Sequence, residues 1–364
     1  FTLPMGVGIN FVINGKDYVI PMVTEEPSVV AACSNAAKMA RPGGGFTTDY
    51  TGSVMISQIQ LLDVPAPFYA KGKILENKEK IAEICNARDP MLVKLGGGVK
   101  DVEVRVLDSL VGPMVVVHLL VDTGDAMGAN AVNTMAEAVA PFLEELTGGR
   151  AELRILSNLA DHRIARARAV FKKDAIGGEE VVDKMIAAYA FAAADPYRAA
   201  TNNKGIMNGI IPVVIATGND TRAIESGAHA YAARSGQYSP FATWEKNADG
   251  DLVGSIEMPM AVGLVGGATK IHPAAKVAVK MLGVKTAGEL AQIIAAVGLA
   301  QNMAAMRALA TEGIQRGHMS LHARNLAATA GATGELLEKI VKQMVSEKNV
   351  RLEYAQELVK QYQK

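Results

Sequence analysis

The sequence predicts an α/β protein with a helix-rich main part, a smaller inserted α+β unit and a terminal helical block. Three observations favour this class. Apolar, β-prone runs alternate with helical patterns between residues 54 and 156. From residue 160 helical patterns dominate, and 35 glycines with only one tryptophan suit closely packed helices. A polar block with three further helical patterns follows Gly313.

The first expected elements are a hairpin and a helix. Residues 11–23 form a hairpin candidate, because Asn14-Gly15 stands between two β-prone runs. Pro27 opens a helix that runs to about Arg41, since proline in the first turn loses no hydrogen bond. The stretch Pro42-Gly-Gly-Gly45 then breaks the chain.

The inserted block is expected to contain both strands and helices. A charged helix is predicted at about 73–88. A second helix follows Asp125-Ala-Met-Gly-Ala-Asn130, runs to about Leu146 and ends at Gly148-Gly149. Strand patterns cover four segments: 54–62, 102–107, 114–121 and 152–156.

The helix-rich remainder carries one further hairpin candidate. Residues 241–246 are expected to pair with 252–257 across Asn247-Ala-Asp-Gly250, and the lone Trp244 is interpreted there as a packing residue. The charged end of the chain is expected to be a mobile, solvated unit. Helical patterns lie at about 273–282, 286–297, 298–312, 320–331, 334–347 and 350–362.

Composition argues against several classes of protein. The chain has 37 basic and 37 acidic residues, with no basic block of the kind that binds nucleic acid or anionic membranes. Apolar runs such as 114–121 are far below the ~18 residues of a membrane helix. Cys33 and Cys85 are too few for a disulfide framework, and no signal peptide is visible, so we expect a cytoplasmic protein. Phe1 is an unusual natural start, and we expect that sequence precedes it.

Two polar segments, 195–209 and 216–222, are the strongest candidates for a binding site. They gather Arg198, Lys204, Asn208 and Asp220 among Gly, Asn and Thr residues, which helix and strand interiors avoid. We therefore expect loops around a pocket, in which the lysine stabilises an oxyanion and the aspartate tunes it. A solvated loop with ordinary surface charges is the alternative, and the residues alone leave both open.

Three further motifs could carry chemistry. Glu26 stands at a helix start, where a carboxylate either complements the helix dipole, with Ser28 as a cap, or transfers a proton. The turn at 125–130 precedes a helix whose N–H groups can hold a phosphate, although its spacing is not GxGxxG. His318 and His322 have the i, i+4 spacing of a zinc site. They lack the HExxH glutamate and any cysteine ligand, so proton donation by one histidine is favoured over metal binding.

Taken in order, these segments resemble the class II, soluble 3-hydroxy-3-methylglutaryl-CoA reductases across essentially the whole chain. The resemblance implies a large substrate domain formed by 1–51 and 158–313, an inserted non-Rossmann NAD-binding domain at 52–157, and a mobile C-terminal flap at 314–364. The motifs that carry it are Glu25-Glu-Pro-Ser28, Gly44-Gly-Phe-Thr-Thr48, Asp125-Ala-Met-Gly-Ala-Asn130, Asn202-Asn-Lys-Gly-Ile-Met-Asn208, Thr217-Gly-Asn-Asp220, Gly263-Leu-Val-Gly-Gly-Ala-Thr269 and Arg316-Gly-His-Met319.

The resemblance further implies a four-electron reduction of hydroxymethylglutaryl-CoA to mevalonate and CoA with two NAD(P)H, or the reverse oxidation. Lys204 would polarise the thioester carbonyl, and Asp220 would orient Lys204. Glu26 would supply the proton in the second hydride step, and His318 would protonate the departing CoA thiolate. The alternative is an inactive relative that binds CoA esters as a sensor or scaffold, which the presence of all four residues disfavours.

Binding roles are implied in the same way. A carboxylate at Asp89 accepts from a ribose 2′-hydroxyl and repels a 2′-phosphate, so we expect NADH to be preferred over NADPH. We expect no metal, nucleic-acid or membrane partner, and a homodimer or higher oligomer whose active sites draw on both subunits. The implied substrate contacts are Ser28, Asn158, Arg198, Asn208, Gln301 and Asn302, and the implied cofactor contacts are Asp89, Met91, Asp125, Met127, Gly128, Ala129 and Asn130.

Overall fold

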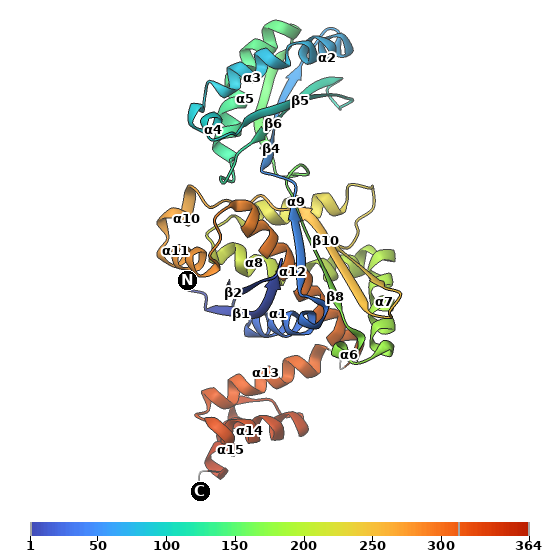
Figure 1. Cartoon of the computed structure of the whole chain (residues 1–364), viewed down its shortest axis with the longest axis vertical. Helices are drawn as coiled ribbons and strands as arrows, with labels where there is room; N and C mark the ends of the chain where they lie inside the picture. The colour runs from blue at the N-terminus through green and yellow to red at the C-terminus, as the bar shows by residue number, and fades with distance from the viewer. Residues whose placement is uncertain (1, 312–313, 363–364) are drawn as a thin grey trace.

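The computed structural model describes residues 2–311 and 314–362, and for residues 314–321 only the course of the backbone. It has three parts in a row (Figure 1): a four-stranded sheet with helices at one end, a six-stranded sheet with helices in the middle, and three helices at the C-terminal end. The combination of two sheets with many helices confirms the α/β class that the sequence predicts.

The middle part is built on a mixed sheet with the strand order β2-β1-β3-β8-β10-β9. The first expected hairpin is confirmed, and Asn14 (φ 50°) and Gly15 (φ 78°) adopt the left-handed conformation that a tight turn requires. The second is confirmed by the pairing of Lys246 with Leu252. The strands are β1 (Met5–Ile13), β2 (Lys16–Val23), β3 (Phe46–Tyr50), β8 (Ile164–Phe171), β9 (Ala242–Lys246) and β10 (Leu252–Pro259).

The glycine-rich turn after the first helix brings the chain close to the six-stranded sheet. A 3-10 turn, η1 (Arg41–Gly43), leads to Gly44 with φ 96°, as the run of glycines predicts. A Cβ at Gly43 would lie 1.9 Å from the backbone oxygen of Val170, so only glycine lets the turn approach β8.

Helices cover the six-stranded sheet, and the long α12 lies at their centre, packed against α1, α8 and β8. The sequence prediction of two helices at 286–297 and 298–312 is wrong, because α12 continues through Gly298 without a break. Glycine at this position allows close packing on α8, since a Cβ there would lie 2.9 Å from Ile210. The helices of this part are α1 (Pro27–Ala40), α6 (Lys173–Ile176), α7 (Glu179–Ala194), α8 (Pro196–Ala216), α9 (Thr221–Ala232), α10 (Gly267–Ile271), α11 (Pro273–Leu282) and α12 (Ala287–Thr311).

By length and composition alone, α12 is the one helix of the described residues that could cross a membrane. Its most apolar 18-residue window is 67% buried inside the protein. This burial is typical of the central helix of a folded domain, which is apolar on every side because other elements surround it.

The four-stranded part has an antiparallel sheet in the order β5-β6-β4-β7, with helices against it (Figure 1). The predicted helix at 73–88 is two helices, because the backbone bends at Asn77 and its side chain donates to the Lys73 backbone oxygen at 2.8 Å. The elements are β4 (Val54–Leu62), α2 (Pro67–Glu76), α3 (Lys78–Asn86), α4 (Pro90–Lys94), β5 (Gly98–Leu107), β6 (Met114–Asp122), α5 (Ala129–Thr147) and β7 (Arg150–Ser157).

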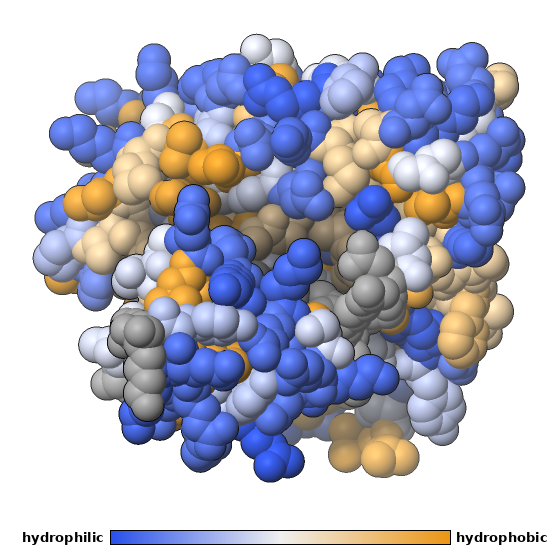
Figure 2. All heavy atoms as spheres, turned by 90° about the horizontal axis from the view of Figure 1, so that it is seen from below, coloured by the Kyte–Doolittle hydropathy of each residue, from blue (hydrophilic) through white to orange (hydrophobic). Residues whose placement is uncertain are grey.

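The terminal part consists of α13 (Ile314–Thr329), α14 (Gly334–Ser346) and α15 (Leu352–Tyr362). Alanine, isoleucine, methionine, leucine and valine side chains of these helices form a small core of their own, apart from the main one. Figure 2 views the molecule from the end at which this part lies and shows a surface that is largely hydrophilic. The expected break at Gly313 lies outside the described residues.

Candidate active site

Two of the cavities in and beside the middle part contain the expected site residues. The first encloses about 580 Å³ and is walled by α1, α8 and α12. The second encloses about 640 Å³ and lies between loops of the middle part and the N-terminal ends of α4 and α5. Among the described residues, none lines both cavities.

α1 brings a carboxylate and a hydroxyl to the first cavity. Pro27 occupies the first turn, and Glu26 is the N-cap residue with an extended backbone (φ −108°, ψ 99°). The Ser28 hydroxyl donates to Glu26 Oε1 at 2.5 Å, so the two side chains are held together at the cavity wall. The two interpretations of Glu26 are therefore compatible, since it stands at a helix N-terminus and also lines a cavity.

α8 brings two cations and several amides to the same cavity. The expectation of a loop at 195–209 is wrong, because residues from Pro196 onward form a helix. Asp195 caps this helix by accepting from the backbone N–H groups of Tyr197 and Arg198 at 3.3 and 3.1 Å. Helical spacing then aligns five polar residues along one wall: Arg198, Thr201, Asn202, Lys204 and Asn208.

The polar residues of α8 are compatible with a helix because their side chains have partners elsewhere. Asn203 accepts from the backbone N–H of Phe241 and donates to the backbone oxygen of Ser239, both at 2.9 Å. An asparagine held in this way does not compete for the backbone of its own helix. Gly209 permits close packing on α12, since a Cβ there would lie 2.7 Å from Gln301 Cβ. Of the second expected loop, 216–222, only residues 217–220 form a loop, because Ala216 ends α8 and Thr221 begins α9.

α12 completes the first cavity with two buried amides. Asn302, 1% exposed, accepts from Trp244 Nε1 at 2.7 Å and donates to Asn202 Oδ1 at 3.0 Å. Gln301 is 6% exposed, and its Oε1 has no hydrogen-bond partner among the described residues. Because buried acceptors in folded proteins are nearly always satisfied, a ligand that enters this cavity is expected to bring a donor to Gln301.

The charges of the first cavity favour an anionic ligand. Of the described residues that line it, Arg198 and Lys204 are basic and Glu26 is acidic. The guanidinium of Arg198 can pair with a carboxylate through two hydrogen bonds, and the ammonium of Lys204 can stabilise a single charged oxygen. The cavity is thus suited to a ligand with a carboxylate at one end and a polarised carbonyl at the other.

The second cavity is suited to a phosphate-bearing cofactor. It is lined by residues 126–131 at the start of α5, where Gly128 has φ 95° and the first N–H groups of the helix are free of helix partners. Gly263 passes so close that a Cβ there would lie 2.5 Å from the Met127 backbone nitrogen. A glycine-lined cradle at a helix N-terminus is the usual binding site for a diphosphate.

A buried arginine that the sequence did not single out holds this cradle together. Arg163 is 0% exposed and donates to the backbone oxygens of Ala126, Met127 and Val262 at 3.1, 3.3 and 2.5 Å. It also donates to the hydroxyl of Tyr50 at 2.7 Å. Arg163 therefore joins the turn before α5 to the loop after β10. No local motif could have revealed it, because its partners come from three distant segments.

The acidic residues of the second cavity are held at helix starts. Asp220 caps α9 by accepting from the Arg222 backbone N–H at 2.9 Å, and hydrogen bonds from the Arg222 guanidinium lower the pKa of Asp220. Asp220 thus stays ionised at neutral pH. Asp89 caps α4 by accepting from the backbone N–H of Leu92 at 2.9 Å, and it lines the cavity beside Arg88.

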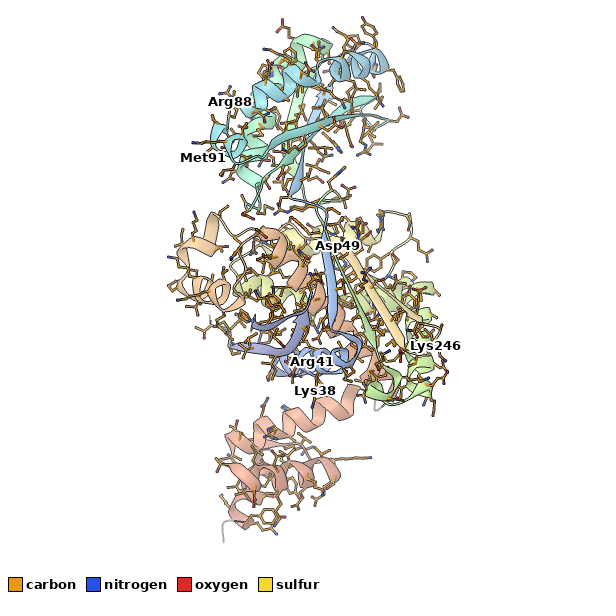
Figure 3. The ribbon with its side chains drawn as sticks, viewed as in Figure 1. Lys38, Arg41, Asp49, Arg88, Met91 and Lys246 are labelled. Carbon is orange, nitrogen blue, oxygen red and sulfur yellow. The ribbon has the colours of Figure 1, made fainter. Side chains whose placement is uncertain are left out.

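Several expected site residues do not line either cavity. Asp125 accepts from the backbone N–H of Ala287 at 2.7 Å and so ties the turn to the start of α12. Met91 is 63% exposed and lies near Arg88 in the four-stranded part (Figure 3), but unlike Arg88 it does not line the second cavity. Asn158 is an exposed residue in the bend after β7. The side chain of His318 lies outside the described residues.

The structure therefore separates the expected catalytic residues into two sets. Glu26 and Lys204 line the first cavity with the substrate contacts Ser28, Arg198, Asn208, Gln301 and Asn302. Asp220 lines the second cavity with the cofactor contacts Asp89, Met127, Gly128, Ala129 and Asn130. Among the described residues, no group of three or more His, Cys, Asp or Glu is placed to hold a metal ion.

Together, a cavity for a small anionic substrate and a cradle for a phosphate-bearing cofactor define a class of protein. That class is a dinucleotide-dependent oxidoreductase, in which the cofactor binds at a helix N-terminus without a Rossmann fingerprint. Comparison with known proteins names the family within this class.

Residues 1–323 match the family model of hydroxymethylglutaryl-coenzyme A reductase. The chain is 64% identical over 359 residues to the 3-hydroxy-3-methylglutaryl-coenzyme A reductase of Archaeoglobus fulgidus, covering 99% of this chain and 82% of that protein. It is 39% identical over 336 residues to the probable reductase of Borreliella burgdorferi, covering 89% and 75%. The class II reductase of Streptococcus pneumoniae, solved with NADPH bound in open conformations, superposes with a TM-score of 0.84 at 43% identity, covering 100% of this chain and 89% of that one.

The chain therefore belongs to the hydroxymethylglutaryl-CoA reductase family. It is an NAD(P)-dependent oxidoreductase of the mevalonate pathway, with hydroxymethylglutaryl-CoA, mevalonate and CoA as its substrates and products. The family resemblance stated from the sequence is confirmed.

Proposed function

We propose that the first cavity binds the hydroxymethylglutaryl group and that Lys204 and Glu26 act there on the reacting carbon. The observation that carries the proposal is the joint presence of Glu26, Arg198 and Lys204 in one cavity. Arg198 pairs with the free carboxylate, and Lys204 faces the thioester carbonyl. Gln301 Oε1, buried and without a partner among the described residues, accepts from the 3-hydroxyl group of the substrate.

The reaction consumes two hydrides and two protons for each thioester reduced to an alcohol and a thiol. Two reduced nicotinamide cofactors, bound one after the other, would supply one hydride each. In the first step a C–H bond forms at the thioester carbon, and the C–S bond then breaks to give an aldehyde and a thiolate. In the second step another C–H bond forms at the aldehyde carbon, and its oxygen becomes the hydroxyl of mevalonate.

Lys204 stabilises the negative charge that develops on the carbonyl oxygen in both steps. Lys204 lies on α8 and lines the first cavity, where its ammonium can meet the oxygen on which the charge develops. Glu26, held by Ser28, gives a proton to the alkoxide of the second step. His318 protonates the CoA thiolate as it leaves.

The residues around the second cavity fit a dinucleotide, and we propose that NADH is preferred over NADPH. The diphosphate is held by the N–H groups at residues 127–130. Asp89 accepts from the adenine ribose hydroxyl and repels a 2′-phosphate. Arg88 beside it is the residue that opposes this preference.

We propose that the enzyme is a homodimer whose active sites combine the first cavity of one subunit with the second cavity of the other. Hydride transfer requires the reacting atoms to approach within about 3.5 Å. Asp220 and the cofactor cradle line a different cavity from Lys204 in this chain. A second copy that places its second cavity against the first supplies the missing half.

The proposed domains are 1–51 with 158–313, 52–157, and 314–364. The flap at 314–364 carries His318 and brings it to the thiolate by closing. We also propose a cytoplasmic location, supported by two buried cysteines that form no disulfide.

The catalytic roles are tested by separating the two reductions. Lys204→Ala should abolish reduction of both hydroxymethylglutaryl-CoA and free mevaldehyde, because both develop an oxyanion. His318→Ala should lower thioester reduction about 100-fold while sparing mevaldehyde, which has no thiolate to protonate. Equal loss of both activities in His318→Ala contradicts its assignment.

The shared site is tested by mixing two inactive variants. Lys204→Ala and Asp220→Ala subunits each keep the residue that the other lacks, so one site in each mixed dimer is intact. After refolding together in equal amounts they should recover about a quarter of the wild-type activity. No recovery, when mixed dimers are shown to form, contradicts a site drawn from both subunits.

Cofactor preference is tested by steady-state kinetics with both cofactors. The wild type should show the higher kcat/KM with NADH, and Asp89→Ala should raise kcat/KM for NADPH at least tenfold by removing the repulsive carboxylate. Met91→Ala is the matched control on the same helix. A higher wild-type kcat/KM with NADPH contradicts the proposal.

A further inference from the structure

Trp244 on β9 is the only tryptophan of the chain, and the sequence suggests that it is a packing residue. The structure buries it to 2% exposure, with its ring 5.9 Å from that of Phe171. It also makes a polar contact that packing does not require. Its indole N–H donates to Oδ1 of Asn302, at the wall of the first cavity, at 2.7 Å.

This contact decides which way the Asn302 amide faces. The indole nitrogen can only donate, so Asn302 must present its oxygen to Trp244 and its nitrogen elsewhere. The Asn302 nitrogen donates to Asn202 Oδ1 at 3.0 Å. The oxygen of the Asn202 amide therefore faces Asn302. Asn202 Nδ2 then points away from Asn302, with Asn203 Oδ1 3.5 Å from it. Trp244 thus fixes the direction of the Asn302 amide. Asn202 is held between Asn302 and Asn203, whose oxygen also accepts from the Phe241 backbone N–H.

The direction matters because both amides line the substrate cavity. Each amide nitrogen carries two hydrogens, and the contacts of the described residues use one on each. The oxygens of both are engaged inside the protein. The wall beside Arg198 and Lys204 therefore offers N–H groups, which complement the anionic oxygens of a hydroxymethylglutaryl ligand.

Without the indole donor the amide of Asn302 keeps only its contact with Asn202 Oδ1, so the rotated orientation of the amide becomes more accessible. An amide rotated by half a turn has almost the same shape but exchanges its donor and acceptor. The rotated amide would set its oxygen against Asn202 Oδ1, so Asn202 would lose its donor and the cavity would lose the second N–H of Asn302.

We propose that Trp244 is a positioning residue for the reductase reaction: through Asn302 it holds the Asn202 and Asn302 amides with their N–H groups towards the substrate. The proposal rests on the assignment of the first cavity as the substrate site. Because these neutral donors contact the ligand before and during reduction, their loss weakens substrate binding more than it slows the chemical step.

The sharpest test replaces only the N–H group. Because the chain has a single tryptophan, growth on β-(3-benzothienyl)alanine in a tryptophan-requiring host exchanges the indole nitrogen for sulfur at residue 244 alone. The KM for hydroxymethylglutaryl-CoA should rise about five- to tenfold, with kcat and the KM for the nicotinamide cofactor unchanged within twofold. An unchanged KM for hydroxymethylglutaryl-CoA overturns the proposal.

A second variant keeps the test informative if the substituted protein folds poorly. Trp244→Phe removes the donor with a smaller ring and should give the same rise in KM. Phe171→Leu is the matched control, since it disturbs the same packed rings but no hydrogen bond. It should lower the urea midpoint of unfolding and leave the KM for hydroxymethylglutaryl-CoA unchanged. A rise in KM of the same size in Phe171→Leu shows that packing alone is responsible and overturns the proposal.

A double-mutant cycle tests whether Trp244 acts through Asn302. In an Asn302→Ala background, Trp244→Phe should add less than a twofold change in KM, because the amide that it orients is gone. An equal effect in both backgrounds overturns the proposal. Failure of the wild type itself to reduce hydroxymethylglutaryl-CoA would count against the proposed function instead, so the two claims remain separable.

Discussion

The position of Lys204 illustrates what a single residue can reveal. A lysine among polar neighbours predicts a partner for an oxyanion. The same neighbours also predict a loop, but Lys204 lies on a helix. The helix is possible because Asn202 and Asn203 are buried and bonded to distant segments, information that a linear sequence does not contain. Local residue types predict that Lys204 belongs to a polar pocket, and it does line the first cavity, but the conformation at this position depends on tertiary partners.

Cys33 and Cys85 are expected to be chemically inert in the folded enzyme. Burial raises the pKa of each thiol to about 12, so at pH 8 almost none of the reactive thiolate exists. Mass spectrometry after iodoacetamide treatment at pH 8 should show no adduct on the native protein and two adducts on the urea-unfolded protein. Ser109→Cys, in the exposed turn between β5 and β6, provides a reactive control. Rapid labelling of Cys33 or Cys85 in the native enzyme would contradict their burial.

At the scale of elements, the cofactor cradle depends on contacts between segments that are far apart in the chain. The hairpins, the strands of the inserted block and the helix after residue 130 follow from local turn residues and apolar periodicity, and the structure has them. The continuous α12 and the bend at Asn77 depend on packing between elements, so local patterns misplace both. The role of Arg163 is invisible to local patterns for the same reason.

Arg163 is predicted to stabilise both the fold and the cofactor site. Arg163→Met should lower the free energy of unfolding by about 3 kcal/mol, because three backbone oxygens lose their buried donor. It should also raise the KM for the nicotinamide cofactor more than that for hydroxymethylglutaryl-CoA, since the turn at 126–127 loosens. Urea unfolding and steady-state kinetics measure both effects.

Arg168, an exposed residue on β8, which begins directly after Arg163, is the control for this prediction. Arg168→Met should change the free energy of unfolding by less than about 0.5 kcal/mol. An equal rise in the KM for the cofactor and in the KM for hydroxymethylglutaryl-CoA in Arg163→Met would indicate a general loss of structure. It would contradict a specific role of Arg163 at the cofactor cradle.

At the scale of the whole molecule, the three parts have different relations to the reaction. The middle part holds the substrate cavity, the four-stranded part contributes the helix ends of the cofactor cavity, and the terminal helices have a small core of their own. Sequence predicts these parts because each has its own periodicity and composition. The sequence could not predict that Lys204 and Asp220, only sixteen positions apart, line different cavities. The two residues are separated by the rest of α8, which runs from the wall of the first cavity towards the second.

The terminal helices are predicted to close over bound ligands. Their separate core lets them move as a unit, and closure would bring His318 to the thiolate. Hydrogen exchange of residues 314–362 should slow when both the CoA ester and the oxidised cofactor are bound, and slow less with either alone. Exchange that is unchanged by both ligands together would contradict the closing flap.

The central claim is that one active site carries a CoA thioester through two successive reductions. The most direct measurement counts NAD(P)H oxidised, by its absorbance, against CoA released, by a thiol reagent, in the same reaction with hydroxymethylglutaryl-CoA. We expect two cofactors oxidised for each CoA, with mevalonate as the product. A ratio of one, with aldehyde accumulating, would contradict the account.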